Sequence, residues 1–346
     1  MTQQTTGVSP LSNPQADFDH PGPLPTTMKA AVIDSTGSPE VLHTAEIALP
    51  VRISAEVLVK VAAAGVNPID AKTRAGKGAS AAIASYPYVL GQDFSGVVIE
   101  TPYESHPLKP GDEVYGMLSA PRGLGAYAEY VSAPSMQLCK KPARLSLVEA
   151  AAVPVAALTA WGMVVDVAKA HEGQRMLILA GSGGVGHFAV QFAAYFGAYV
   201  IATSSSRNSS WLHELGAAEV IDYASTRFEH EVSNVDVVID LIGNTIDNTG
   251  TRALQTLRPG GLLVNAPSGS WPGLIEDART LGLRATTYKV SPDASTLTVI
   301  ARLINSGDVH VHVDEIFTLD HAADAHRRIE EGHTRGKLVI SVAEQV

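Results

Sequence analysis

The chain has 346 residues, 45% of them hydrophobic, which is enough for one large or two ordinary domains with a substantial core. Its formal net charge of −10 argues against a nucleic-acid-binding surface, because phosphate contacts need clustered Lys and Arg. The single cysteine, Cys139, excludes an intrachain disulfide and a cysteine-rich zinc site.

Residues 1–27 are expected to form a flexible tail, because they are rich in Pro, Gln, Thr and Ser. They lack the basic start and the apolar core of a signal peptide. The apolar runs elsewhere are too short to cross a membrane. Together with the lone cysteine, this predicts a cytoplasmic protein with no membrane partner.

Residues 28–148 are predicted to form a compact β-rich domain. Gly and Pro turns separate its strand-like runs, which are 28–34, 56–66, 96–100, 112–118 and 126–131. An alanine-rich, helix-like run follows over 146–168. Ser146 can cap its N-terminus, and Glu149 stands three residues later, which is the spacing of a capping box.

Beyond residue 170, apolar β-branched runs alternate with helix-like runs, which predicts a doubly wound α/β unit with a parallel sheet. The strand-like runs are 175–180, 199–204, 219–223, 235–243 and 261–268. The helix-like runs between them are 187–197, 207–216 and 248–258.

The chain after residue 290 is expected to return to the β-rich domain. It carries a helix-like run over 295–307, another over 321–332 and a strand-like run over 337–342. His310 and His312 would share one face of a strand between the two helices, and they are interpreted as surface residues. The predicted domains are therefore 28–148 with 292–346, and 149–291.

A glycine-rich loop follows the first strand of the α/β unit and opens a helix. Gly181, Gly183 and Gly186 match the pattern G-x-G-x-x-G. In that pattern the first glycine allows a tight turn, the second lets the backbone approach a pyrophosphate, and the third lets the helix pack on the strand. The helix N-terminus also offers N–H groups to phosphate. We predict dinucleotide binding by Gly181, Ser182, Gly183, Gly184, Val185 and Gly186; the alternative is a turn without a ligand.

The end of the second strand of this unit indicates which dinucleotide binds. No acidic residue stands between Thr203 and Ser210, where Asp or Glu would favour NAD. Ser204 and Ser205 can donate to a 2′-phosphate, and Arg207 can pair with it. The sequence therefore predicts NADP(H) as the cofactor; the alternative is a solvated polar loop.

Several separate motifs follow one another along the chain. They are GVNPID (65–70), GQDFSGVV (91–98), KPGDEVYG (109–116), GAYAEYV (125–131), AAAVPVAALTAW (150–161), AGSGGVG (180–186), LGAAEVIDY (215–223) and GKLVI (336–340). In this order they resemble the motifs of the zinc-independent quinone oxidoreductase (zeta-crystallin-like) family of the medium-chain dehydrogenase/reductase superfamily. The resemblance spans nearly all of residues 28–346. It implies an α/β protein with a GroES-like catalytic domain and a Rossmann domain, NADPH in the cleft between them, and a homodimer.

The resemblance also implies roles for single residues. Asn67 corresponds to an asparagine near the nicotinamide and the substrate, Asp70 can orient its loop, and Thr159 corresponds to a threonine near the nicotinamide ribose. Tyr223 matches a tyrosine near the 2′-phosphate, and Lys337, in GKLVI, is assigned to the cofactor site. Structural alternatives are an Asn-Pro turn, a threonine bonded to its own helix, and a packed strand-end aromatic.

The positions that hold zinc in related alcohol dehydrogenases carry other residues in this chain. Those enzymes have Cys in place of Asn67, and His-Glu in place of Gln92 and Asp93. Side-chain amides are poor zinc ligands, and the four-cysteine structural zinc lobe is missing. We therefore predict no metal site.

Without a metal, the reduction of an electron-poor double bond is the reaction that these residues favour. A quinone or an α,β-unsaturated carbonyl needs only hydride at carbon and a hydrogen bond at oxygen. The predicted catalytic residues are Asn67 and Asp70, and the substrate is a small molecule. Where the family often has a tyrosine this chain has Lys77, so Tyr86 or Tyr88 can substitute, or solvent can supply the proton. Alternatives are an enoyl-thioester or pathway-specific enone reductase, and a cofactor-binding regulatory protein without turnover.

Overall fold

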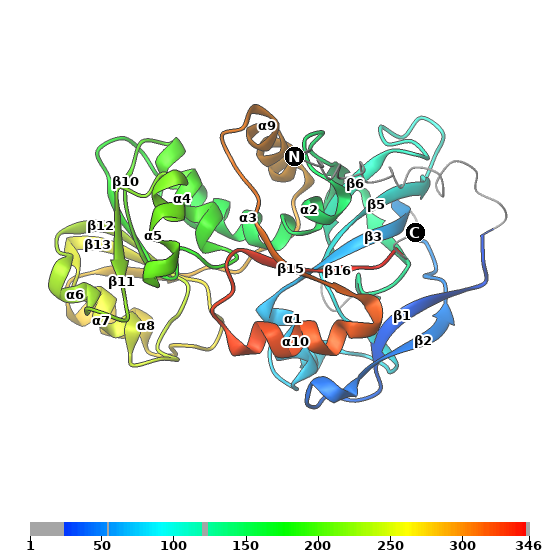
Figure 1. Ribbon diagram of the computed structural model, residues 1–346, viewed down its shortest axis with the longest axis horizontal. Coiled ribbons are helices and arrows are strands. Elements are labelled where there is room, and N and C mark those ends of the chain that lie inside the picture. The colour runs from blue at the N-terminus through cyan, green and yellow to red at the C-terminus, as the bar shows by residue number, and fades with distance from the viewer. Residues whose placement is uncertain (1–23, 54, 120–123, 344–346) are drawn as a thin grey trace, which may run out of the picture.

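The computed structural model describes residues 24–53, 55–119 and 124–343, so most of the predicted tail lies outside the described residues. Two parts lie side by side along the long axis (Figure 1). A parallel sheet with its helices forms one end, and a β-rich part forms the other. Helices α3 (Pro154–Trp161) and α9 (Ala294–Ser306) lie between them.

The β-rich part contains a seven-stranded sheet and a three-stranded sheet. The larger sheet has the order β15-β16-β3-β5-β6-β8, and β7 also pairs with β3. Its strands are β3 (Glu56–Val66), β5 (Asp93–Glu100), β6 (Glu113–Met117), β7 (Tyr130–Pro134), β8 (Leu138–Lys140), β15 (Val313–Thr318) and β16 (Lys337–Ser341). The smaller sheet joins β2 (Leu42–Ala48), β1 (Thr27–Ile33) and β4 (Tyr88–Val89). Strand β16 runs antiparallel to β3, so the end of the chain completes a sheet begun near its start.

The other part is a parallel sheet of six strands in the order β11-β10-β9-β12-β13-β14. The strands are β9 (Arg175–Ile178), β10 (Tyr199–Ser204), β11 (Glu219–Asp222), β12 (Val235–Asp240), β13 (Leu257–Asn265) and β14 (Arg284–Thr287). The strand order reverses between β9 and β12, and ligands of such sheets bind outside the carboxyl ends of the strands at that point.

Neighbouring residues of each strand point to opposite faces of the sheet, and the strands carry buried apolar side chains on both faces. Helices therefore cover both faces. Ile178 packs with α3, α4 (Gly186–Tyr195) and α5 (Ser209–Glu214). Leu177 belongs to a second cluster on the other face. The helices of that face are α6 (Phe228–Glu231), α7 (Thr249–Leu254) and α8 (Leu274–Thr280).

Two helices of the β-rich part lie beside one another below its large sheet (Figure 1). They are α1 (Pro68–Arg74) and α10 (Ala322–Glu331). The remaining short helices are α2 (Leu147–Ala151), the π-helical turn Gly162–Val167, and the 3-10 turns Pro39–Val41, Ser80–Ala82, Ser135–Gln137, Ser206–Asn208 and Leu319–His321. The domain boundaries predicted at residues 149 and 291 stay predictions.

Several elements differ from the expectation. The single helix predicted over 146–168 is broken before Pro154, which has no backbone N–H to donate to a carbonyl oxygen of the preceding turn. Strand β14 was missed because Arg284–Thr287 contains no apolar run. The prediction that His310 and His312 share a strand face is wrong, since β15 begins at Val313. The backbone of His310 instead hydrogen-bonds the Gln191 side chain on α4.

The predicted capping box at the start of α2 is confirmed. The backbone N–H of Glu149 donates to Ser146 Oγ at 3.2 Å, and the N–H of Ser146 donates to Glu149 Oε2 at 2.8 Å. Each side chain therefore satisfies a backbone donor that the first helical turn leaves without an intrahelical acceptor.

We expect Ser146→Ala to lower the free energy of unfolding by about 1 kcal/mol, the usual effect of losing a capping hydroxyl. Urea unfolding followed by circular dichroism measures it. Ser210, exposed on α5, provides the control, and Ser210→Ala should change the value by less than about 0.5 kcal/mol. Equal effects of the two variants would contradict a capping role.

Candidate active site

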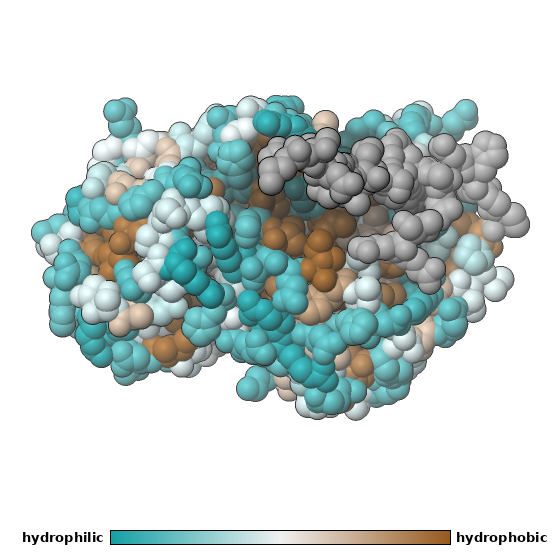
Figure 2. Space-filling view, in the orientation of Figure 1, coloured by the Kyte–Doolittle hydropathy of each residue, from teal (hydrophilic) through white to brown (hydrophobic). Residues whose placement is uncertain are grey.

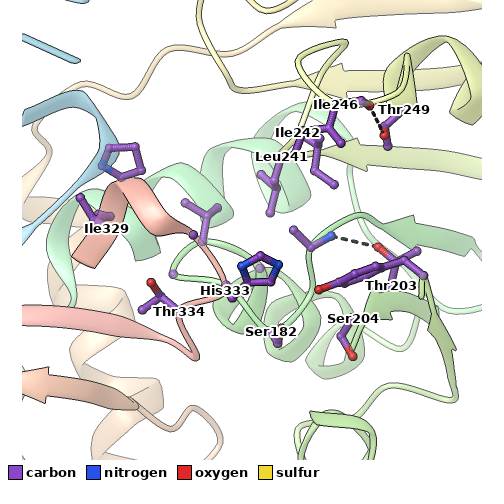
Figure 3. Close-up of a pocket in the computed structure, with 18 of the residues that line it drawn as sticks. Ser182, Thr203, Ser204, Leu241, Ile242, Ile246, Thr249, Ile329, His333 and Thr334 are labelled. Atoms are coloured by element: carbon purple, nitrogen blue, oxygen red, sulfur yellow. Dashed lines mark hydrogen bonds between the residues drawn. The ribbon is translucent and has the colours of Figure 1, made fainter. Parts of the chain in front are cut away.

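A cleft of about 1020 Å³ lies at the carboxyl ends of the parallel strands and opens between the two parts. In the view of Figure 2, hydrophilic residues cover much of the surface, and hydrophobic residues gather in the hollow between the parts. Figure 3 shows that three parts of the chain line the cleft. The glycine loop and β10 provide Ser182, Thr203 and Ser204. The stretch from the end of β12 to the start of α7 provides Leu241, Ile242, Ile246 and Thr249, and the end of α10 and the residues after it provide Ile329, His333 and Thr334.

The glycines of the loop face different surroundings. A Cβ on Gly186 would overlap the carbonyl oxygen of Ala180 and the backbone of Gly181, so helix α4 packs directly on the loop. A Cβ on Gly181 would lie 2.8 Å from the Ala202 side chain. At Gly183, among the described residues other than its two chain neighbours, such a Cβ would have only the Ala180 carbonyl oxygen within 4 Å, at 3.3 Å. Since Gly183 lines the cleft, its open side leaves the backbone accessible to a ligand.

These surroundings predict different stabilities for two matched variants. Gly186→Ala should lower the free energy of unfolding by about 1–3 kcal/mol, because the new methyl group meets backbone that cannot move aside cheaply. Gly183→Ala should cost clearly less, because its methyl group meets one carbonyl oxygen at 3.3 Å and otherwise faces the cleft. Urea unfolding of both variants measures the difference, and equal losses would contradict the packing described.

The segment 332–337, between α10 and β16, lies against the glycine loop. The N–H of Gly336 donates to the carbonyl oxygen of Ser182 at 2.9 Å. The Arg207 guanidinium donates to the carbonyl oxygen of His333 at 2.7 Å. The His333 ring stands in the middle of the cleft (Figure 3). Arg207, predicted to pair with a 2′-phosphate, therefore also ties this segment to the parallel-sheet part, and its phosphate role stays a prediction.

Of the remaining predicted cofactor residues, some line the cleft and others do not. Ser204 and Tyr223 line the cleft, and Tyr223 is about half exposed. Ser205 follows directly, and its carbonyl oxygen accepts a hydrogen bond from Ser204 Oγ at 2.9 Å. Thr159 is not among the lining residues, and its hydroxyl donates to the Val155 carbonyl oxygen of its own helix at 2.6 Å. That is the backbone-bonded arrangement given above as its structural alternative.

Asn67 and Lys337 line the opposite wall of the cleft together with Val66. Asn67 follows β3 and precedes Pro68, which favours the extended backbone that Asn67 adopts. The ammonium group of Lys337 donates to the side-chain oxygen of Asn67, and to the carbonyl oxygen of Val66 at 2.9 Å. The amide nitrogen of Asn67 donates to Asp93 Oδ2 at 2.8 Å.

Asp93 is fully buried and completes this cluster. Its Oδ2 lies 3.5 Å from Lys337 Nζ, and its Oδ1 accepts the N–H of Val155, in the first turn of α3, at 2.7 Å. Gly65 leaves room for it, because a Cβ there would stand 2.8 Å from the carboxylate. Burial raises the pKa of Asp93 and lowers the pKa of Lys337, and the attraction between the two charges opposes both shifts.

Asp70 lies in the first turn of α1 behind Asn67. Its Oδ2 accepts the backbone N–H of Asn67 at 2.9 Å, so it fixes the loop as predicted. The Tyr127 hydroxyl lies 3.3 Å from the same oxygen and 3.3 Å from Nε2 of His326. Burial raises the pKa of Asp70 to about 7; the N–H of Asn67 opposes this shift, and the charge of Asp93 adds to it.

Sequence reasoning did not assign functional positions to Asp93, Tyr127 or His326. Asp93 follows Gln92 in the GQDFSGVV motif, and nothing in that local pattern indicates that its side chain contacts Asn67 and Lys337. Tyr127 and His326 are 199 positions apart, and neither stands in a local pattern that would reveal the contact. Tyr88, suggested as a substitute tyrosine, is buried beside Asp70, whose charge adds to the effect of burial in raising the pKa of Tyr88 to about 12. Tyr86 is exposed.

The raised pKa of Asp70 gives a pH-dependent stability. An acid whose pKa is higher in the folded state stabilises folding below its unfolded pKa and loses that contribution as pH rises through the folded pKa. Asp70→Asn removes the effect, so variant minus parent in unfolding free energy should rise by about 2–4 kcal/mol between pH 4 and pH 8. Urea unfolding across this range measures it, and a flat difference would contradict the assignment.

Among residues 24–53, 55–119 and 124–343, no group of three or more His, Cys, Asp or Glu side chains is arranged to hold a metal ion. At the position compared with a zinc ligand, the Asn67 amide is bonded to Asp93 and Lys337. That the protein uses no zinc stays a prediction, which a measurement of the zinc content of the purified protein can test.

A GroES-like β-rich domain and a Rossmann domain that share one cleft define a medium-chain dehydrogenase/reductase. The model for "Alcohol dehydrogenase GroES-like domain" matches residues 54–143, and that for "Zinc-binding dehydrogenase" matches 215–340. The chain is 33% identical over 361 residues to the mitochondrial NAD(P)H oxidoreductase RTN4IP1 of Danio rerio, with 92% of each chain covered. It is 35% identical over 327 residues to the 2-methylene-furan-3-one reductase of Solanum lycopersicum, covering 92% of this chain and 80% of that protein.

The solved quinone oxidoreductase of Coxiella burnetii superposes with a TM-score of 0.86 at 36% identity, covering 92% of this chain and all of the other. The chain therefore belongs to the medium-chain dehydrogenase/reductase superfamily, in its zeta-crystallin-like quinone oxidoreductase family. The predicted family and fold class are confirmed. The Danio rerio relative is mitochondrial by name, so the cytoplasmic location is not confirmed. No described helix is long and apolar enough to cross a membrane.

Proposed function

We propose that the protein is an NADPH-dependent reductase of quinones or α,β-unsaturated carbonyl compounds. The observation that carries the proposal is one cleft with the glycine loop on one wall and the Asn67 amide on the other. A cofactor held by the loop and a substrate bonded to Asn67 would then meet inside the same space. The names of the relatives above, an NAD(P)H oxidoreductase, a quinone oxidoreductase and an enone reductase, support this function.

The residues of the cleft fit a dinucleotide. Gly183 leaves its backbone open, and the N-terminus of α4, which begins at Gly186, places a partial positive charge beside the loop. Ser204 stands at the end of β10 where an acidic residue would select NAD. Ser204, Ser205, Arg207 and Tyr223 are proposed to hold the adenosine half with its 2′-phosphate, and Thr159 to lie near the nicotinamide end.

The bound cofactor supplies a hydride to an electron-poor carbon of the substrate. Negative charge then develops on the substrate oxygen, and an N–H of Asn67 can donate to it in a cleft with many apolar walls. Asp70 holds the backbone of Asn67 in place through its hydrogen bond. Solvent provides the proton that the product needs, since Tyr88, the substitute suggested by the sequence, is buried and is not among the residues that line the cleft. An enoyl-thioester reductase and a cofactor-binding protein without turnover are the alternatives, and a homodimer in the cytoplasm is the proposed form.

NADPH should bind more tightly than NADH by about 1–3 kcal/mol, because a charge-assisted contact to the 2′-phosphate is gained. Fluorescence titration measures both affinities. Gly183→Val should abolish NADPH binding while the protein stays folded, and Arg207→Ala should reduce the preference for NADPH. Arg279→Ala, in an exposed arginine on α8, is the control.

The same preparations decide between the functions. NADPH oxidation with quinones and enones, and none with the matched saturated ketones, is expected for the proposed reductase. Activity confined to enoyl thioesters would favour the first alternative, and NADPH binding without oxidation by any acceptor would favour the second. Equal affinities for NADPH and NADH would contradict the cofactor assignment.

A further inference from the structure

The ammonium group of Lys337 has its donors directed into the protein. It is surrounded by three acceptors, the Val66 carbonyl oxygen, the Asn67 side-chain oxygen and Asp93 Oδ2, all within 3.5 Å. An ammonium group has three N–H bonds, so these acceptors match its donors. Lys337 is 3% exposed although it stands at the wall of the cleft. This geometry suits a residue that holds a neighbour better than one that reaches for a phosphate.

The neighbour that Lys337 holds is the Asn67 amide. Its oxygen faces the cation of Lys337, and one N–H of its nitrogen faces the anion of Asp93. An amide flipped by 180° would direct its N–H groups toward Lys337 and its oxygen toward Asp93, and both contacts would be repulsive. The two charges therefore select one orientation of the amide. That orientation leaves the second N–H of Asn67 for the cleft.

We propose that Lys337 and Asp93 are positioning residues that fix the Asn67 amide as a hydrogen-bond donor to the substrate oxygen, and that Lys337 is not a phosphate ligand of the cofactor. This inference rests on the proposed function. It changes the role predicted for Lys337, from cofactor binding to control of the catalytic amide. In the absence of the cation, only Asp93 favours this orientation, so the amide is held less firmly as a donor to the substrate oxygen.

A double-mutant cycle on kcat tests whether Lys337 acts through Asn67. Asn67→Ala and Lys337→Met should each lower kcat with an enone by about 10²–10³-fold, the usual effect of losing one such donor. In the Asn67→Ala background, Lys337→Met should lower kcat by less than about threefold further. Multiplied losses in the double variant would show that Lys337 acts independently, and would overturn the proposal.

NADPH affinity, measured by fluorescence titration, separates positioning from phosphate binding without requiring turnover. Lys337→Met should change the dissociation constant by less than about threefold, whereas loss of a phosphate ligand would weaken binding by tenfold or more and overturn the proposal. Lys169→Met, which removes an exposed lysine just before β9 and away from the cleft, is the control for loss of one positive charge. Lys337→Arg should keep less than a tenth of the parent kcat, since the larger planar guanidinium group does not match the three acceptors.

Two further measurements distinguish failure of this proposal from misfolding of the variant and from failure of the proposed function. If Lys337→Met does not fold because Asp93 is left unpaired, the double variant Asp93→Asn, Lys337→Met removes both charges and replaces it in the same measurements. If the parent binds NADPH but reduces no acceptor, the proposed function fails. In that case a dissociation constant unchanged by Lys337→Met still supports a positioning role, and a tenfold weaker one overturns it.

Discussion

A carboxylate without solvent contact constrains much of this molecule. Asp93 is fully buried, and an unpaired buried charge costs several kcal/mol, so donors must come to it from other parts of the chain. They come from three segments: the N–H of Val155 at the start of α3, the Asn67 amide after β3, and the Lys337 ammonium in β16. These contacts bring the last strand, the β-rich sheet and the first helix beside the Rossmann sheet together at one wall of the cleft.

The second wall depends on close packing rather than on charge. Gly186 brings α4 onto the backbone of the loop. The loop follows β9, so it lies at the carboxyl ends of the parallel strands, beside the point where the strand order switches. The 332–337 segment links the two walls, because Gly336 bonds the loop through Ser182 while Lys337, the next residue, enters the charged cluster. A shift of the 332–337 segment would therefore move the glycine loop and the Asn67 amide together.

The sequence was sufficient for those parts of the fold that local pattern controls. The strand Glu56–Val66, the capping box at Ser146 and the glycine loop each depend on residues close together in the chain. Strand β14 was missed because a polar edge strand has a weak local signal. The break before α3 was missed because the alanine-rich pattern on both sides of Pro154 was interpreted as one helix, although proline is a strong helix breaker. For the site, motif order located Asn67 and Asp70. The partners that determine what Asn67 can do lie 26 and 270 positions away.

The comparison with zinc enzymes shows why such partners matter. Read position by position, Asn67 and Gln92 are places where zinc-binding residues are missing, which suggests a site that has lost its electrophile. The structure shows the same corner filled by a polar amide held between a buried cation and a buried anion. Stabilisation of a developing oxyanion requires a donor that is already oriented before the charge appears. Two fixed charges supply that orientation through an ordinary asparagine, so the chemistry of the site depends on the direction in which one amide points.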